Sequence, residues 1–543
     1  MRSKQKLTHI IALILVICFV VTMFSACTVK QGSDTKGEEK TTEAGVEIDD
    51  GSKTYVYNMN IHNAQNEWLK CEVLKTWREK FNIEFNFLPI TWNDWQQKVM
   101  IWMSSGDVPD VTYWDMKLSM ANDYEKWVKA GLIKEIKGID KYPNVKKHMD
   151  AMKVDDALMV DGKKYVWPCS KDTTLVGDIS CRGFIYRKDW ARQLGLVKED
   201  DIYTWEEMVE FAKQCVEKDP GGVGKNKVAG LACTTWAWPN SLGVEQFTAG
   251  VIGSGGYTKK DGKWEWNARA PEYLEAIKEI KRLYDAGIIW VDNALCKGDE
   301  PSQKFQAGEI AVYYDNIFAY NLHDKRIKMT ENIQGLKPED ITYMKVKTPY
   351  GKFAAIRDTE FWCVSLFSAK MSDAKFDRLM KAWDWMLTDE GYFTRQIGIR
   401  GIDWEFEGDS VKYLWPYNEE TKRYERPKDN PTYIGQLPYQ PIGITEGFGF
   451  LDPNIKSTNA GKDAYDYCKW CEKNAALIAP NYALSTFKAP NKDKYGSFAN
   501  DMKDAVIQII ISSTDPDKDW NDFLKSKEDK VNLVIDELNA GLK

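Results

Sequence analysis

The stretch that decides the fold class covers residues 69–114 and reads LKCEVLKTWREKFNIEFNFLPITWNDWQQKVMIWMSSGDVPDVTYW. Near its start, Leu69, Val73 and Trp77 recur at intervals of four residues, which predicts an amphipathic helix. Apolar and polar residues then alternate from residue 81 to residue 87, as in a strand with one apolar face. The first half of the stretch therefore predicts a helix followed by a strand.

The second half of the stretch repeats this order. An apolar stripe over residues 95–103 follows Asp94, a candidate N-cap for a second helix. A turn rich in Ser, Gly and Pro at 104–110 leads into an apolar run at 111–114, and residues 55–59 predict a strand before the first helix. Alternating strands and helices are typical of a parallel α/β sheet. We therefore expect an α/β fold, with further helices over 274–284 and 376–387.

Length and composition point to a globular chain with more than one lobe. The chain has 543 residues, which is more than one ordinary core accommodates. Charged residues make up 29% and hydrophobic residues 43%, which excludes a polytopic membrane protein and a mainly disordered one. The net charge of -7 gives no electrostatic reason to bind nucleic acid, so we expect no nucleic-acid partner. The 22 Trp, 26 Tyr and 21 Phe exceed what cores normally use and indicate exposed flat apolar surfaces.

The N-terminal segment has the features of an export signal. Basic residues within the first six positions precede an apolar run at 10–24 that is short for a transmembrane helix. The sequence Phe24-Ser25-Ala26-Cys27 then resembles the bacterial lipobox, with Phe in place of the usual Leu. The resemblance implies that residues 1–26 are a lipoprotein signal peptide and that Cys27 becomes an acylated N-terminus. A signal-anchor helix, or an ordinary cleavage site beside a Cys, is the alternative.

The next segment is predicted to be a flexible tether. Residues 28–52 are rich in Lys, Glu, Asp, Thr and Gly and contain few apolar side chains, so they cannot build a core. A flexible chain of this length spans roughly 25–30 Å on average. We therefore expect residues 27–52 to be a lipidated, disordered tether that holds a globular domain at the extracytoplasmic face of the cell membrane.

Cysteine and histidine patterns predict neither a metal site nor a cofactor. Without Cys18 and Cys27, nine of the eleven Cys are left, an odd number that cannot pair completely. Cys468 and Cys471 have CxxC spacing, which suits a redox pair or half a zinc site, but no second CxxC or nearby His completes a ligand set. We therefore interpret them as buried or free thiols.

The motifs of nucleophilic hydrolases are absent from the sequence. No HExxH or GxSxG occurs, and we predict that the protein is not an enzyme. Residues 221–226 superficially resemble a phosphate-binding loop but lack its first Gly and its Ser/Thr, and we interpret them as a turn. Residues 515–519 resemble the start of a calcium loop, but Trp520 occupies the position of the required Gly, so we predict a helix N-cap at Asp515 instead.

Six segments in a fixed order carry a family resemblance. They are MSSGDVPDV at 103–111, YEKWVKAGLI at 124–133, DGKKYVWP at 161–168, YRKDW at 186–190 with LGL at 194–196, TWEE at 204–207, and KFQAGEIAV at 304–312. Together they resemble the bacterial extracellular solute-binding proteins of ABC importers, the family typified by maltose-binding protein. The lipoprotein branch that serves oligosaccharide uptake is the most similar, and IRGIDW at 399–404 also resembles a segment of that branch.

The resemblance implies two discontinuous α/β lobes of the periplasmic-binding-protein type that close on a ligand in the cleft between them. Residues 53–173 and 346–435 are assigned to one lobe, and residues 174–345 and 436–543 to the other. The implied protein is a monomeric receptor that hands its ligand to the permease subunits of an ABC transporter. Its implied ligand is an oligosaccharide.

Aromatic residues beside polar ones mark the candidate ligand site. Sugar rings stack on flat aromatic faces and their hydroxyl groups need polar partners, so loops at strand ends that carry both kinds of residue are the candidates. The family resemblance places cleft residues in the loops after 113 and after 315. The candidates are Asn63, Trp114, Asp115, Trp167, Trp236, Trp238, Asp315, Asn316, Phe318, Phe361 and Trp362. We predict that Trp68, Trp77, Trp95, Trp102, Trp127 and Trp383 are core residues, because they lie on helical stripes or in packing motifs.

Three alternatives stay open from the sequence. An exported glycoside hydrolase would need two carboxylates whose separation in space the sequence does not reveal. A receptor for an oligopeptide would use the same cleft for another ligand. An adhesin or sensory protein would have the same fold without an importer.

Overall fold

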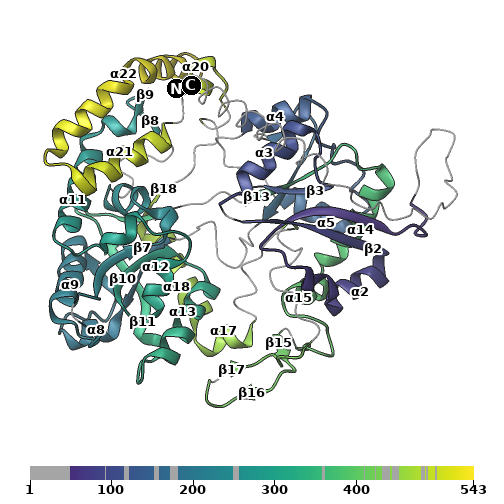
Figure 1. Cartoon of the computed structure of the whole chain (residues 1–543), viewed down its shortest axis with the longest axis horizontal. Coiled ribbons are helices and arrows are strands. Elements are labelled where there is room, and N and C mark those ends of the chain that lie inside the picture. The colour runs from purple at the N-terminus through teal and green to yellow at the C-terminus, as the bar shows by residue number, and fades with distance from the viewer. Residues whose placement is uncertain are drawn as a thin grey trace, which may run out of the picture. The chain divides into compact units, whose positions relative to one another are not determined.

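The computed structural model describes, within the 543-residue chain, residues 49–91, 93–114, 121–151, 158–170, 182–224, 226–248, 256–356, 361–408, 410–421, 423–430, 441–442, 452–478, 484, 487–495 and 498–542. Cys27, the predicted acylation site, and Asp115, a candidate ligand-binding residue, lie outside these ranges. The fold described below is that of residues 54–543 (Figure 1).

The first sheet has the strand order β2-β1-β3-β13-β4. Parallel pairing joins β1 to β2 and β3, whereas β13 runs antiparallel to β3 and β4. The strands are β1 (Tyr55–His62), β2 (Ile83–Ile90), β3 (Val111–Trp114), β4 (Val166–Ser170) and β13 (Phe361–Phe367). Helices of the same lobe are α2 (Glu72–Phe81), α3 (Trp95–Ser105), α4 (Ala121–Lys129), α5 (Pro143–Ala151) and α14 (Asp373–Met386).

The element order predicted for residues 55–114 is confirmed, with one local difference. Phe81 is the last residue of α2 rather than the first of a strand, because Asn82 adopts a left-handed φ of 53° that ends the helix. Asp94 stands at the N-cap position of α3, and its carboxylate accepts a hydrogen bond from the backbone N–H of Thr91 at 2.7 Å. Trp77 and Trp95 are buried, as the stripes predicted.

The second sheet has seven strands, in the order β18-β12-β11-β5-β10-β7 with β6 paired to β11. Here β10 runs parallel to β7 and antiparallel to β5, and β5 is also antiparallel to β11. The strands are β5 (Arg182–Arg187), β6 (Ile202–Thr204), β7 (Ala229–Cys233), β10 (Ile310–Asn316), β11 (Ile341–Lys347), β12 (Phe353–Ile356) and β18 (Ala475–Ile478).

Helices and short turns of helix cover the second sheet, and most begin with identifiable signals. Thr204 and Glu207 form a capping box at the start of α9, in which each side chain accepts from the other residue's backbone N–H. Asp515 caps α22, where its carboxylate accepts from the N–H of Lys518 at 3.0 Å, so the predicted N-cap is confirmed. The longer helices are α8 (Lys188–Gln193), α9 (Trp205–Lys218), α11 (Pro271–Asp285), α12 (Glu300–Gln306), α13 (Ala319–Asn332), α18 (Ala460–Asn474), α21 (Ala499–Ser512) and α22 (Pro516–Gly541). In Figure 1, α21 and α22 lie beside a hairpin of β8 (Tyr257–Lys260) and β9 (Lys263–Trp266), and Asn539 of α22 accepts from the N–H of Trp264 at 2.8 Å.

The chain changes lobe at several places, so each lobe is built from separate segments. The first change lies between β4 and β5, and the second lies between β12 and β13. Ile442 then packs in the core of the first sheet, whereas Ile455 of α17 (Pro453–Ser457) packs in a core of the second. Residues 353–356 belong to the range 346–435 that the sequence analysis assigned to the first lobe, yet β12 pairs with β18 in the second sheet.

A small aromatic module follows the helix α15 (Asp389–Gln396). It consists of two hairpins, one of β14 (Trp404–Glu407) and β15 (Ser410–Tyr413) and one of β16 (Tyr417–Asn418) and β17 (Arg423–Tyr424). Phe393, Trp404 and Tyr413 belong to its separate hydrophobic core.

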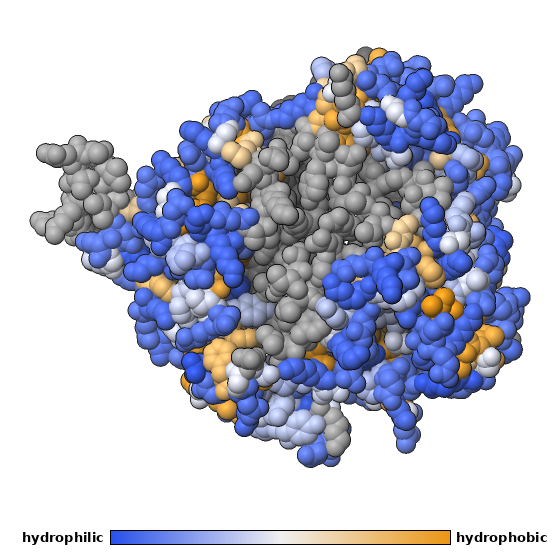
Figure 2. All heavy atoms as spheres, turned by 180° about the vertical axis from the view of Figure 1, so that it is seen from behind, coloured by the Kyte–Doolittle hydropathy of each residue, from blue (hydrophilic) through white to orange (hydrophobic). Residues whose placement is uncertain are grey.

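The tryptophans predicted to be core residues are confirmed. Trp77, Trp95, Trp127 and Trp383 are buried, and Trp68 and Trp102 are partly buried against the core of the first sheet. Cys468 and Cys471 are buried and unpaired in α18, as the packing interpretation predicted. Within the described ranges, no helix is long and apolar enough to span a bilayer. Figure 2 shows a largely hydrophilic face on which hydrophobic residues form small, separate patches.

Candidate ligand-binding site

The carboxyl ends of β7 and β10 meet at one edge of the second sheet. The two strands are parallel neighbours, with Tyr314 opposite Cys233, and the backbone N–H of Thr234 donates to the carbonyl of Tyr314 at 3.1 Å. The loop after each strand therefore begins at the same edge, where α/β sheets commonly bind ligands. The sequence-predicted candidates Trp236, Trp238, Asp315, Asn316 and Phe318 all come from these two strand ends and loops.

Asp315 is held in a hydrogen-bonded network at this edge. Its Oδ2 accepts from Lys325 Nζ at 2.9 Å and from Asn321 Nδ2 at 2.9 Å, and its Oδ1 accepts from the backbone N–H of Asn316 at 2.8 Å. The Lys325 side chain is only 1% exposed, so the ion pair is desolvated and well satisfied. Because its carboxylate is engaged in this way, Asp315 fixes the loop between β10 and α13.

The side chains that follow Asp315 are more open. Asn316 and Phe318 are half-buried, and Tyr320, in the first turn of α13, is 69% exposed. Burial raises the pKa of the Tyr313 and Tyr314 hydroxyls well above the ordinary value, so both are neutral phenols. This edge therefore presents an amide and an aromatic ring at the surface, above a core in which the Tyr313 and Tyr314 phenols are buried and neutral.

The loop after β7 carries two tryptophans, Trp236 and Trp238. Trp238 is buried in the core of the second lobe. Trp236 lies in the short helix η3 (Thr235–Ala237), and its side chain lies outside the described part of the chain. Asn293 supports this loop, since it accepts from the N–H of Cys233 at 2.8 Å and donates to the carbonyl of Cys233 at 3.0 Å.

In the first lobe, the ends of β1 and β3 form a comparable edge. Asn60 joins the two strands, because its side chain donates to the carbonyl of Tyr113 at 2.7 Å and accepts from the N–H of Tyr113 at 2.7 Å. His62 is buried with its ring 4.4 Å from that of Trp95 in an edge-on arrangement. Asn63 follows at the surface with a left-handed φ of 51°. Asn63 is therefore an exposed residue directly after a buried, tightly packed strand end.

Trp114 and Trp167 lie inside the core of the first lobe. Trp114, the last residue of β3, is fully buried 4.7 Å from the ring of Trp127, and its Nε1 donates to Gln96 Oε1 at 2.9 Å. Trp167 is also fully buried, and its Nε1 donates to the carbonyl of Ile442 at 2.9 Å. For Phe361 and Trp362, the description covers the β13 backbone and not the side chains.

The structure thus groups the candidates into two strand edges. Asp315, Asn316, Phe318 and the backbone of Trp236 belong to the edge of the second sheet, and Asn63 and the end of β3 belong to that of the first. Sequence reasoning missed Tyr320 although it lies close to Phe318 in the chain. It also missed Arg182, which lies opposite Asn316 only because of the β5–β10 register.

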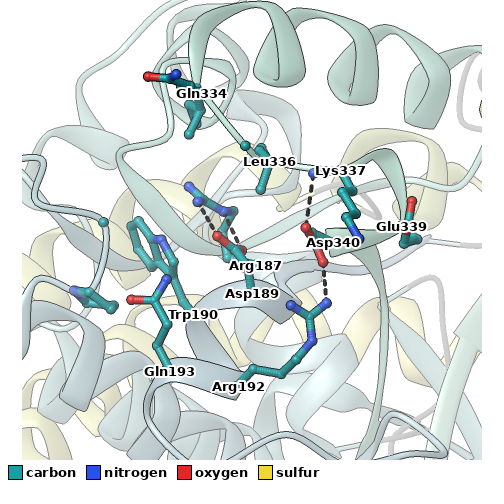
Figure 3. Close-up of a pocket in the computed structure, with 14 residues that line it drawn as sticks. Arg187, Asp189, Trp190, Arg192, Gln193, Gln334, Leu336, Lys337, Glu339 and Asp340 are labelled. Carbon is teal, nitrogen blue, oxygen red and sulfur yellow. Dashed lines mark hydrogen bonds and ion pairs between the residues drawn. The ribbon is translucent and has the colours of Figure 1, made fainter.

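A pocket of about 500 Å³ lies at the opposite end of the second sheet (Figure 3). Arg187, at the end of β5, donates two hydrogen bonds to Asp189 at 2.8 and 2.6 Å and lies 4.4 Å above the ring of Trp190. Arg192 pairs with Asp340 on the far wall. Arg187 lies at the opposite end of β5 from Arg182, the residue that faces Asn316, so this pocket is remote from Asn316. Its two arginines are each already paired with an Asp. It is therefore a poorer candidate for the ligand site.

The described residues contain no cluster of three or more His, Cys, Asp or Glu side chains able to hold a metal ion. His148 and His323 have their pKa lowered to about 4, chiefly by burial, and both are held by hydrogen bonds within the protein. Both imidazoles are therefore uncharged at neutral pH.

Comparison with known proteins identifies the family. Residues 72–390 match the model of the bacterial extracellular solute-binding protein family. A relative from Bacillus subtilis, the polygalacturonan/rhamnogalacturonan-binding protein YtcQ, is 25% identical over 422 residues, which cover 75% of each chain. The lipoprotein LipO of the same organism is 28% identical over 239 residues, covering 41% of this chain and 43% of LipO.

Solved structures show the same two-lobed fold. The alginate-binding protein AlgQ2 superposes with a TM-score of 0.64 at 16% identity, covering 90% of this chain and 98% of AlgQ2. The Streptococcus pneumoniae ABC-transporter substrate-binding protein FusA, in complex with kestose, gives a TM-score of 0.62 at 18% identity and covers 89% and 98%. The expected two-lobed α/β architecture is therefore confirmed. The chain belongs to the family of bacterial extracellular solute-binding proteins and is a binding receptor rather than an enzyme.

Proposed function

We propose that the protein is the substrate-binding component of an ABC importer and that its ligand is an oligosaccharide. The observation that carries the proposal is the edge at the end of β10, where the Asn316 amide lies near the half-buried Phe318 and the exposed Tyr320. Aromatic faces and polar groups side by side are what a sugar ring needs for stacking and for hydrogen bonding. The relatives whose names mention sugar ligands support the same chemistry.

The proposed contacts come from both lobes. Asn63 in the first lobe and Asn316, Phe318 and Tyr320 in the second would hold the sugar when the lobes close. Asp115, Trp236, Phe361 and Trp362 stay candidates, as do Trp114, Trp167, Trp238 and Asp315, whose burial favours a supporting role. The permease subunits of the transporter are the proposed partners, and the receptor acts as a monomer.

We also propose that Cys27 is acylated and anchors the protein at the extracytoplasmic face of the membrane. The lipobox-like Phe24-Ser25-Ala26-Cys27 supports this, as does the similarity to a relative named as a lipoprotein. Several acyl chains on one residue would give durable anchorage, which a single chain does not.

A ligand panel tests the proposal directly. The mature chain without its signal would be melted in the presence of neutral oligosaccharides, uronic-acid oligosaccharides and a peptide mixture. Ligands that bind only the folded state raise the melting temperature by mass action. We expect an oligosaccharide to do so and to be recovered unchanged by mass spectrometry after long incubation. Stabilisation by peptides alone would make the protein an oligopeptide receptor.

A further inference from the structure

The aromatic module that follows α15 is built into the first lobe. Its core includes Phe393 of α15, whose ring lies 5.2 Å from that of Trp404. Ile399, just after α15, packs against the core of the first sheet. The buried Asp403 holds this connection together, since it accepts from the backbone N–H of Ile399 at 2.7 Å and from Trp415 Nε1 at 2.9 Å. The module is therefore a rigid extension of the first lobe.

The same module is attached to the second lobe by contacts that we call the clasp. The backbone N–H of Tyr424 in β17 donates to Asn454 Oδ1 at 2.8 Å, and Asn454 Nδ2 donates to the carbonyl of Tyr424 at 2.9 Å. Beside them, Arg423 Nη2 lies 3.0 Å from Glu331 Oε1 on α13. Asn454 lies on α17, which belongs to the second lobe because Ile455 packs in one of its cores. The module thus contacts both lobes.

The clasp lies where the chain enters the second lobe. The last change of lobe lies between Ile442, in the core of the first sheet, and α17, whose N-cap is Asp452. Asn454 comes directly after this start, and its backbone N–H donates to Asp452 Oδ1 at 2.8 Å. When two lobes rotate about a hinge, points beside the connecting segments move least. The clasp therefore has the position of a pivot rather than that of a latch across the cleft.

The two attachments of the module differ in chemistry. On the first-lobe side, the module is held by aromatic packing around Trp404 and by the hydrogen bonds of the fully buried Asp403. On the second-lobe side, Tyr424 and Asn454 are half-buried, and the ion pair of Arg423 is partly exposed. Neutral hydrogen bonds and exposed ion pairs each contribute little to stability. The clasp consequently guides the motion of the lobes without locking them together.

We propose that the module is a brace across the hinge and that the clasp between Tyr424 and Asn454 is its pivot, which limits how far the two lobes open and twist. The brace is a noncovalent connection in addition to the segments of chain that cross between the lobes. Without it, the lobes sample a wider range of relative orientations, because only the crossing segments then restrain them. The inference concerns the motion of the lobes and holds whichever solute the protein binds.

The test measures the distance between the lobes in solution, without a ligand. Spin labels on azide-bearing amino acids at the exposed positions 79 of α2 and 213 of α9 report this distance by double electron–electron resonance and leave the native Cys unlabelled. Asn454→Ala removes both hydrogen bonds of the clasp. We expect orientations in the tails of the wild-type distance distribution to become about five- to hundredfold more populated, as for the loss of two neutral hydrogen bonds. Asn454→Asp keeps only the acceptor and should raise them about two- to tenfold.

A matched control separates this role from a purely local one. Arg400→Gln breaks the exposed pair of Arg400 with Glu405, which lies within the module, and it should leave the distance distribution unchanged. Melting temperatures show whether each variant is folded, and Asn454→Asp decides if Asn454→Ala is not. A lower melting temperature with an unchanged distribution would make the clasp a local contact and refute the brace. Broadening of equal size in Arg400→Gln would refute it as well.

Discussion

The ring of His148 lies flat against that of Trp167, with centroids 4.3 Å apart and planes inclined by 9°. His148 comes from α5 and Trp167 from β4, and His148 Nε2 donates to the carbonyl of Pro168 at 2.7 Å. Trp167 donates in turn to Ile442, far along the chain. The stack therefore ties three distant segments into the first lobe and leaves the half-buried His148 imidazole uncharged at neutral pH.

This burial predicts a loss of stability in acid. Burial lowers the pKa of His148 to about 4, against 6.5 for an exposed His. Between these values the unfolded chain binds a proton that the folded protein does not, so the free energy of unfolding falls as the pH drops from about 6.5 to 4. The stabilisation is complete above pH 6.5, and its loss for one such group reaches ~3 kcal/mol. Because His148→Gln removes the titrating group, its deficit relative to wild type should shrink steadily as the pH falls, as measured by denaturant unfolding. A deficit that is constant from pH 7 to pH 4 would contradict the assignment.

The buried pair of Lys325 and Asp315 predicts a large effect of a single substitution. Lys325→Met leaves the Asp315 carboxylate without its cation in a desolvated site, and we expect a loss of about 3–5 kcal/mol in the free energy of unfolding. Lys328→Met on the same helix is the control, because the Lys328–Asp324 pair is exposed and should contribute less than about 1 kcal/mol. Equal losses in urea unfolding of the two variants would show that the Asp315 network does not stabilise the edge.

Substitution of Trp114 should lower the stability of the protein, whereas substitution of Tyr320 should lower its affinity for the ligand. Trp114 is fully buried, so Trp114→Ala should lower the free energy of unfolding by about 3–5 kcal/mol. Tyr320 is mostly exposed, so Tyr320→Ala should change stability by less than about 0.5 kcal/mol while it weakens oligosaccharide binding roughly tenfold through lost stacking. Calorimetry on the folded fraction and denaturant unfolding would measure the two quantities. Normal binding by Tyr320→Ala would remove Tyr320 from the site, and normal stability of Trp114→Ala would contradict its place in the core.

We expect attachment of the protein to the membrane to depend on Cys27. In cells that express the full chain, Cys27→Ala should move the protein from the membrane fraction to the medium or the soluble envelope fraction, because no acyl chain is attached. Cys18→Ala, a change within the same leader, is the matched control and should leave the protein in the membrane fraction. Retention of Cys27→Ala with normal signal cleavage would rule out anchorage through this residue.

Much of the fold could be read from local sequence patterns. The stripe that includes Val73 and Trp77 predicted α2, and the alternation at 81–87 predicted β2, since both depend only on which neighbours in the chain share a face. The six segments in family order pointed to the two-lobed receptor, which the family match confirms. The candidate loop after β1 followed from the predicted strand end, whereas the loop after β10 was indicated by the family resemblance.

By itself, then, the sequence determined the order of the elements, the family and the loops that border the site, because these depend on local periodicity and motifs. Only the tertiary structure decided which side chains meet, because contacts such as those of Asp315 with Lys325 and of Arg182 with Glu245 depend on register and helix packing. The same holds for burial, because the local sequence around a tryptophan at a strand end does not show whether the ring faces solvent or the core. Trp114 and Trp167 are buried because Trp127 and His148, from other elements, cover them. Likewise, β12 joins the second sheet because its partner β18 lies more than a hundred residues further along the chain, beyond the reach of any local pattern.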